Sequence, residues 1–241
     1  DTFKVLEYIQ EHWEDNPNLS LAINTNLGVP DALIDKLITI AKDLCDNNKI
    51  KELIIFTSVE ATKEQAEYTR YGLNYDTFWV NIDRILTELP KVTVNIMAAF
   101  NALSVFTYSE LIDKVFEMKK KHHNSERYWI SALQLDTSYI RWPKHLSVLI
   151  LENEHIELIL AAAKKAFYLG ANAFTRDYYG FSGVEIQKIK RIYDFCKSEK
   201  TFDKETNRKD FAKFITDYDK RRSTNFNETF PQLKEFYAKY K

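Results

Sequence analysis

The sequence predicts an α/β protein in which repeated strand–helix units form a parallel sheet, followed by a helical C-terminal extension. Four short apolar segments, each followed by an amphipathic helical pattern, recur at spacings of roughly 35 to 40 residues, as repeated βα units do. Each segment also gives way to polar side chains where it ends. In a parallel sheet or barrel these strand ends share one edge, where such folds bind their ligands.

Composition and charge describe an ordinary globular chain. Its 241 residues can form one large domain or a domain with an appendage, and 45% of them are hydrophobic. A formal net charge of -1 gives no electrostatic reason to expect nucleic acid or an anionic membrane as a partner. No apolar run approaches the roughly 20 residues that a membrane helix needs, and the first residues carry no signal-peptide pattern.

The cysteines and the first residue bear on location and completeness. Cys45 and Cys196 are far apart and belong to no Cys-x-x-Cys pair or Cys/His cluster, so we expect neither a disulfide nor a metal site from them. A reducing cytoplasm is the expected location. The chain starts with Asp1 rather than Met and opens directly into a helical pattern, so we expect a fragment whose N-terminal part is missing.

The first unit is predicted from short-range patterns. Apolar residues at three-and-four spacing indicate a helix over residues 2–15, ending before Asn16-Pro17. An apolar run over residues 19–23 indicates a strand, and the polar triplet Asn24-Thr25-Asn26 follows it. A helix over residues 30–44 comes next, because Pro and Asp suit its first turn.

The second strand carries the polar groups of greatest interest. Residues 53–58 begin as an aliphatic run and end at Ser58, and Glu60 follows two residues later. A polar stretch then leads to Glu67 and Arg70. An aliphatic run that changes to hydroxyl and carboxylate so abruptly is typical of a buried parallel strand that delivers ligand-binding groups to the edge of a sheet.

The third unit repeats the pattern. Asn74 or Asp76 is expected to cap a helix that ends at Leu89, before a proline. The third strand is predicted over residues 92–99, and Asn101 follows shortly after it.

The fourth unit and the C-terminal region complete the prediction. Thr107-x-x-Glu110 indicates a capping box in front of a helix, and residues 129–135 are the fourth strand, with Asp136 at its end. Residues 146–151 are expected to form an edge strand. Four helices are then predicted, over residues 153–169, from Ser182 to about 197, from Asp203 onward and from Pro231 to the end. We expect residues 1–151 to hold the βα units and residues 152–241 to form a helical extension covering them.

Each candidate side chain has a structural and a functional interpretation. Ser58 and Glu60 either hydrogen-bond the next loop or together bind the vicinal diol of a ribose. Arg70 is either a solvated cation or a fork for a carboxylate. Asn26 and Asn101, like Asn24, are ambiguous, because asparagine is common where strands give way to turns. Asp136 is either a general base or a cap, and the cap is favoured.

Several enzyme classes lack their motifs. The sequence has no Gly-rich phosphate loop, no Gly-x-Ser-x-Gly elbow and no His-Glu-x-x-His, and it has only five glycines in all. Phosphate binding by a backbone cradle is therefore not expected.

The motifs resemble those of radical S-adenosylmethionine (SAM) enzymes, and especially the SPASM/twitch group. Ser58-Val-Glu60, Glu67 and Arg70 are similar to the family's Ser-x-Asp-Gly and His-Asp-x-x-Arg, and the interval from serine to arginine matches without a gap. Asn24-Thr25-Asn26 resembles the family's Thr-Asn-Gly, with Leu27 in place of Gly. The tail segments Asp219-Lys-Arg-Arg and Asn225-Phe-x-Glu-Thr-Phe-Pro resemble the C-terminal part of twitch-containing members.

The resemblance implies a fold, a cofactor and a site. It implies a partial (βα) barrel of the radical SAM type, in which Ser58 and Glu60 contact the SAM ribose and Arg70 its carboxylate. Asn26 and Asn101 lie at the neighbouring rim. It also implies a reductant protein such as a flavodoxin or ferredoxin.

The [4Fe–4S] cluster of the family has no ligands in this sequence. The family holds that cluster with a Cys-x-x-x-Cys-x-x-Cys loop, which is absent, as are auxiliary-cluster cysteines. We attribute the absence to truncation before Asp1, so the full-length parent is expected to carry the cluster and the fragment alone is expected to be inactive.

The sequence leaves three functions open. The first is a radical SAM enzyme that reductively cleaves SAM to a 5′-deoxyadenosyl radical, which abstracts hydrogen from an unknown substrate, with a peptide as one option. The second is a non-catalytic binding module whose polar rim holds a partner. The third is a barrel hydrolase that uses Glu60 and Asp136 as acid and base.

Overall fold

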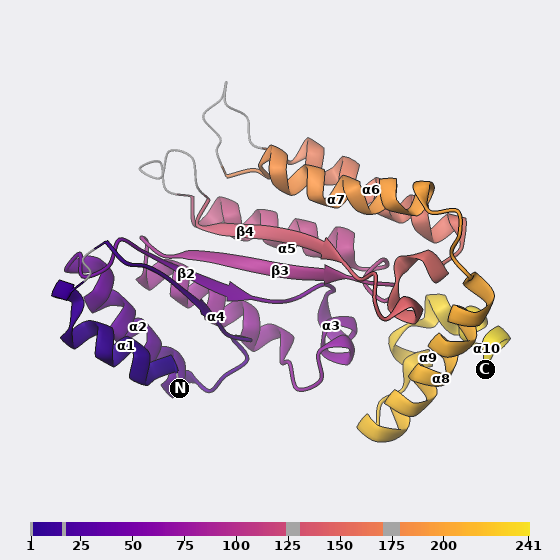
Figure 1. The fold of residues 1–241 in the computed structure, drawn as a ribbon, viewed down its shortest axis with the longest axis horizontal. Coiled ribbons are helices and arrows are strands. Elements are labelled where there is room, and N and C mark those ends of the chain that lie inside the picture. The colour runs from indigo at the N-terminus through magenta and orange to yellow at the C-terminus, as the bar shows by residue number, and fades with distance from the viewer. Residues whose placement is uncertain (1, 16–17, 124–130, 171–178) are drawn as a thin grey trace.

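One parallel sheet with helices packed against it forms the body of the protein, and a helical group lies at the C-terminal end (Figure 1). A computed structural model describes residues 2–15, 18–123, 131–170 and 179–241. The α/β class and the parallel sheet predicted from the sequence are confirmed. The elements follow in the order α1 (Thr2–Glu11), η1 (Trp13–Asp15), β1 (Ser20–Asn24), α2 (Asp31–Asp46), β2 (Glu52–Thr57), α3 (Lys63–Thr69), α4 (Tyr75–Glu88), β3 (Thr93–Phe100), α5 (Tyr108–Lys121), β4 (Leu133–Tyr139), η2 (Lys144–Leu146), η3 (Val148–Ile150), α6 (Asn153–Tyr168), α7 (Gly183–Ser198), α8 (Lys204–Arg222), α9 (Phe226–Thr229), η4 (Pro231–Leu233) and α10 (Lys234–Tyr240).

The four strands are all parallel and lie side by side in sequence order, β1-β2-β3-β4. One row of paired residues crosses the sheet through Asn24, Phe56, Asn95 and Gln134. Because β1 and β4 each have a neighbouring strand on one side only, the described strands form an open sheet and do not close into a barrel.

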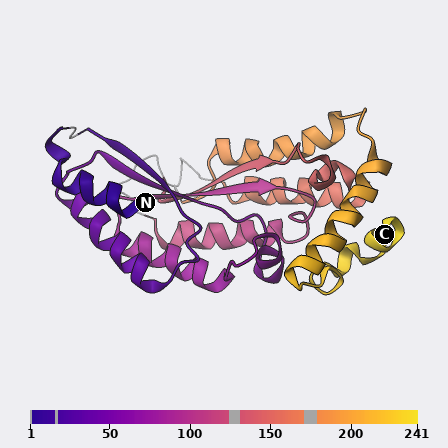
Figure 2. The ribbon, with the colours of Figure 1, turned by 60° about the horizontal axis from the view of Figure 1, so that its bottom comes forward.

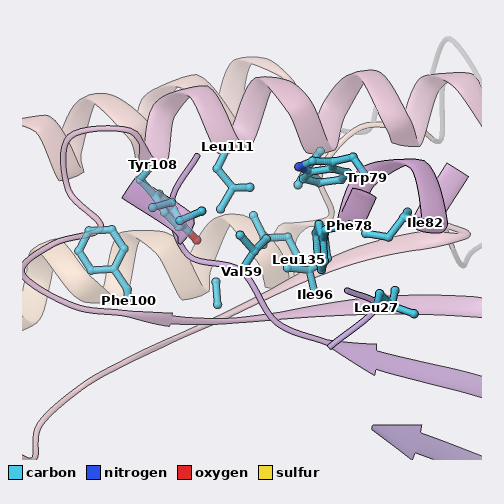
Figure 3. Packing of buried hydrophobic residues seen from close by; sticks show 14 of the residues in the cluster. Leu27, Val59, Phe78, Trp79, Ile82, Ile96, Phe100, Tyr108, Leu111 and Leu135 are labelled. Atoms are coloured by element: carbon cyan, nitrogen blue, oxygen red, sulfur yellow. The ribbon is translucent and has the colours of Figure 1, made fainter. Parts of the chain in front are cut away.

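Helices α2, α4 and α5 lie along one face of this sheet (Figures 1 and 2). Alternate strand residues point toward them, because successive side chains of a strand face opposite sides. In β2, Leu53, Ile55 and Thr57 are buried, whereas Ile54 and Phe56 are only partly buried. Figure 3 shows the apolar layer between strands and helices, which includes Ile96, Leu135, Phe78, Ile82 and Leu111.

The opposite face of the sheet is less covered. Met97, in the middle of β3, is 37% exposed. Asp136 on β4 pairs with Met97 in the ladder and is partly exposed. Parallel sheets are usually buried on both faces, so the partial exposure of Met97 and Asp136 sets this face apart from the helix-covered one.

The outer edge of β4 is covered by helix α7 and not by a fifth strand. Glu185, in the first turn of α7, accepts a hydrogen bond from the backbone N–H of Leu135 at 2.8 Å. It also forms a buried ion pair with Lys119 of α5, with an Nζ–Oε1 distance of 3.0 Å. Ser182 and Glu185 form a capping box at the start of α7, as expected for a helix that begins at Ser182.

Most predicted elements are found, with three differences. The fourth strand begins at Leu133, so Asp136 lies inside β4 and not at its end; the predicted start at residue 129 falls outside the described residues. Helix α3 was not predicted. The edge strand expected at residues 146–151 was wrong: this segment forms the turns η2 and η3, and the Ile150 carbonyl accepts a hydrogen bond from Arg208 of α8.

The predicted capping box at Thr107 was also wrong. Thr107 precedes α5, but its side chain makes no capping bond. Its hydroxyl instead accepts from the Thr62 N–H at 3.1 Å, and Glu110 accepts from the Thr62 hydroxyl at 3.0 Å. The two side chains therefore fix the start of α3 rather than the start of their own helix.

The C-terminal helices divide into two groups. Helices α6 and α7 pack against each other, with α6 beside α5 and α7 beside β4. Helices α8, α9 and α10 gather at the far end of the molecule, next to η2, η3 and α3 (Figure 1). The helical character expected after residue 152 is found in the described residues, and the proposed division into 1–151 and 152–241 stays a prediction.

The buried pair of Lys119 and Glu185 gives the first testable prediction. Lys119→Met should lower the free energy of unfolding by about 3–5 kcal/mol, because it leaves the Glu185 carboxylate buried without its cation. Urea denaturation at pH 7 measures this. Lys121→Met is the matched control: it breaks an exposed pair with Asp83 and should cost less than about 1 kcal/mol. Equal losses in the two variants would contradict the role given to the buried pair.

Candidate functional site

The carboxyl ends of the four strands meet at one edge of the sheet, because the strands are parallel. Asn24 ends β1, Ser58 directly follows β2, and Asn101 directly follows β3. The loop after β1 is tied to the end of β2 by a hydrogen bond from the Thr25 N–H to the Phe56 carbonyl at 2.9 Å. Four of the five predicted site positions, all but Arg70, therefore follow the ends of neighbouring strands.

Glu60 and Arg70 are in direct contact. The Nε and Nη2 atoms of Arg70 both lie 2.7 Å from Oε2 of Glu60. Glu60 is only 5% exposed, whereas the side chain of Arg70 is 32% exposed. Burial raises the pKa of the Glu60 carboxyl, and the charge of Arg70 offsets part of that rise.

One nitrogen of the arginine remains available. No hydrogen bond or ion pair joins Nη1 of Arg70 to another described residue. A guanidinium that uses one side for an internal carboxylate can therefore offer its remaining N–H groups to a second carboxylate.

The short helix α3 brings Arg70 back to Glu60. It begins at Lys63, which has a positive φ of 49°, and ends where the Arg70 N–H donates to the Ala66 carbonyl. Sequence reasoning missed this helix and the residues that hold it, Thr62 and Gln65. A signal was present, since Thr62 precedes a run of good helix formers.

Ser58 presents a free hydroxyl at the end of β2. Because alternate residues of a strand share a face, Ser58 lies on the same side as Ile54 and Phe56, which face away from the helices. Its side chain is half-buried, and no hydrogen bond joins its hydroxyl to another described residue. Ser58 can therefore donate to or accept from a ligand at this edge.

Asn26 lies in an exposed turn after β1. Its Oδ1 accepts from the Gly28 N–H at 3.2 Å. The next residue, Leu27, is buried with a left-handed φ of 52°, and its carbonyl accepts from Asn81 at 2.7 Å. Leu27 thus adopts a backbone conformation that glycine adopts most readily. In the Thr-Asn-Gly motif that this segment resembles, glycine stands at this position.

Asn101 is buried and uses its side chain in its own turn. Its Oδ1 accepts from the Leu103 N–H at 2.9 Å, and its Nδ2 donates to the Ala99 carbonyl at 3.1 Å. The side chain shapes the loop after β3, and the structure shows it bonded to the backbone rather than reaching out from the rim.

Asp136 is not at the strand end where it was expected. It lies within β4, beside Thr137, which is buried toward the helices, so Asp136 faces the opposite side. Its carboxylate pairs with Lys188 of α7 at 2.7 Å. The structure therefore places Glu60 and Asp136 with different cations on different elements, and it brings together only Glu60 and Arg70 through direct contact.

No group of three or more His, Cys, Asp and Glu side chains in the described part of the chain is arranged to hold a metal ion. Within the same residues, no helix has both the length and the apolar character needed to cross a bilayer.

The raised pKa of Glu60 gives a prediction on pH. The folded protein keeps a proton on this carboxyl at pH values where the unfolded chain, with an ordinary pKa near 4.5, has released it. The stability of the wild type relative to Glu60→Gln should therefore fall as pH rises from about 4.5 through the folded pKa. Urea denaturation of both proteins between pH 4 and 8 measures the difference. A difference that grows with pH would show that the Arg70 charge outweighs burial.

Comparison with known proteins gives no relative from which a function could be inferred. The chain matches no protein-family model, no curated protein and no solved structure.

Proposed function

We propose that this chain is the SAM-binding part of a radical SAM enzyme of the SPASM/twitch group. The observation that carries the proposal is the contact between Glu60 and Arg70 at the carboxyl end of β2. The two residues are ten positions apart in the sequence, and their intervals from Ser58 match the family motif. The architecture consists of parallel βα units with one less covered sheet face, and it is compatible with a partial barrel of that type.

The described residues suit the groups of SAM. Ser58 offers a free hydroxyl, and Glu60 a carboxylate, as partners for the ribose hydroxyls. Arg70 offers Nη1 to the carboxylate of the methionine part while Glu60 holds its other side. Asn26 and Asn101 shape the neighbouring loops of the rim and so limit the space around the ligand.

The iron–sulfur cluster does not fit the residues of this chain. Cys45 is buried on α2, and Cys196 lies on α7, so neither stands beside a second cysteine. In this proposal the full-length parent holds the [4Fe–4S] cluster. It is located in the cytoplasm and receives its electrons from a flavodoxin- or ferredoxin-like protein. The parent would cleave SAM to a 5′-deoxyadenosyl radical that abstracts hydrogen from a substrate, with a peptide as the class suggested by the SPASM/twitch likeness.

In this proposal the chain orients SAM and shields it. The radical chemistry belongs to the cofactor, and the protein supplies binding, orientation and exclusion of water. Glu60 is buried, so its hydrogen bonds act in a medium of lower polarity than water and are correspondingly stronger.

Binding of SAM to the 241-residue chain tests the proposal. Arg70→Ala should weaken binding by roughly 10- to 100-fold, because a charge-assisted hydrogen bond to a carboxylate is lost. Isothermal titration calorimetry with SAM measures the affinity. Arg84→Ala is the matched control, since Arg84 pairs with Asp35 on the exposed surface of α2 and α4. Equal weakening in both variants, or no binding to the wild type, would contradict the proposed site.

The parent protein provides the test of activity. Anaerobic reconstitution with iron and sulfide, followed by assay for 5′-deoxyadenosine, should yield that product when the cluster is fully loaded. A fully loaded parent that yields none would favour the second candidate, a non-catalytic module that binds a partner through the uncovered face around Met97.

A further inference from the structure

Helix α3 connects the proposed site to the C-terminal helices. It has only seven residues, and a helix of that length is unstable in isolation. Its position is therefore set by what it contacts. Because Arg70 directly follows α3 as its C-cap, any contact that fixes the last turn also fixes the start of the arginine side chain.

Tyr68, in that last turn, joins α3 to α8. Its hydroxyl donates to Oδ1 of Asp219 at 2.8 Å, and its backbone carbonyl accepts from the hydroxyl of Tyr218. Its ring lies 5.0 Å from that of Tyr218 and 5.2 Å from that of Phe230. Tyr68 is buried, whereas its partners Tyr218 and Asp219 are partly exposed.

Asp219 is the centre of this contact. Besides Tyr68, it accepts from the Thr224 hydroxyl at 2.7 Å and from the Phe226 N–H at 2.9 Å, where α9 begins. Helix α9 then returns to α3, since the Thr229 carbonyl accepts from Gln65 at 3.1 Å. One carboxylate thus shapes the turn between α8 and α9 and holds the end of α3.

The other side of α3 is held independently. Thr62 and Gln65 hydrogen-bond to Thr107 and Glu110 at the start of α5. These contacts fix the first turn of α3. The last turn, which carries Tyr68 and leads into Arg70, contacts α8 through Tyr68, and Glu67 in that turn also accepts from the Tyr75 N–H of α4 at 2.9 Å.

We infer that Asp219 is a positioning residue for Arg70. Through Tyr68 it holds the last turn of α3 in the place where Arg70 meets Glu60, although no hydrogen bond or ion pair joins Asp219 to either residue. The C-terminal helices therefore control the shape of the ligand site from outside it. The effect on ligand affinity rests on the proposed function, whereas the effect on the Arg70–Glu60 contact does not.

The test measures the Arg70–Glu60 contact directly. In the ¹⁵N spectrum of the 241-residue chain, Arg70→Lys identifies the Nε–H signal of Arg70, whose hydrogen exchange is slowed by its bond to Glu60. Tyr68→Phe removes only the hydroxyl that reaches Asp219 and keeps the ring packing. It should speed the exchange of that Nε–H by about fivefold, the equivalent of one hydrogen bond. Asp219→Asn, which keeps the size of the side chain, should also speed the exchange.

Tyr237→Phe is the matched control. Tyr237 lies on α10 in the same helical group, and its hydroxyl bonds to Thr216 of α8 rather than to α3. The control should leave the exchange of the Arg70 Nε–H unchanged. Circular dichroism establishes that each variant is folded, and if Tyr68→Phe fails to fold, Asp219→Asn carries the test.

SAM affinity, measured on the same variants, separates this inference from the proposed function. Faster exchange in Tyr68→Phe together with about fivefold weaker SAM binding supports both. Faster exchange in a chain that binds no SAM supports the positioning role and overturns the SAM site. Unchanged exchange in the folded variants overturns the positioning role, whatever the SAM affinity.

Discussion

The end of the sheet at β4 depends on one buried carboxylate. Glu185 accepts the Leu135 N–H that points outward from β4, which a neighbouring strand would otherwise use. Burying this charge is costly, and the structure compensates with Lys119 and with the N–H of Ser182. The ammonium of Lys119 also lies 5.3 Å from the ring centre of Phe181. Helix α7 thereby takes the place that a fifth strand would occupy, and α6 packs behind it.

This arrangement leaves an asymmetric sheet. One face packs against α2, α4 and α5, and the other keeps Met97 and Asp136 partly exposed. Asn95, in the middle of that second face, has a buried Oδ1 with no hydrogen-bond partner among the described residues. Polar groups on this face therefore lie next to the polar carboxyl-end edge of the strands.

Helix α3 joins three parts of the molecule that are distant in sequence. Its N-cap residue and first turn are bonded to the start of α5, its last turn to α8, and its C-cap residue Arg70 to Glu60 after β2. The side chains of Thr107 and Glu110 are used for this connection rather than for capping, which shows that a tertiary contact outweighs a local one here. A helix too short to stand alone is suited to this role, because its neighbours determine where it lies.

The sequence by itself determined the α/β class, the four strands and most helix starts, including the caps at Ser182 and Asp203, and it narrowed the cap of α4 to Asn74 or Asp76, of which the structure uses Asn74. These follow from hydrophobic periodicity and local capping, which act within a few residues. It also identified Glu60 and Arg70 as candidates. Tertiary structure alone decided that the two residues meet, that Asn101 bonds within its own turn and that Asp136 pairs with Lys188. It also decided that residues 146–151 form turns, since Arg208 binds the Ile150 carbonyl from 58 residues away. Contacts between distant segments leave no periodic trace in the sequence, so only the folded chain reveals them.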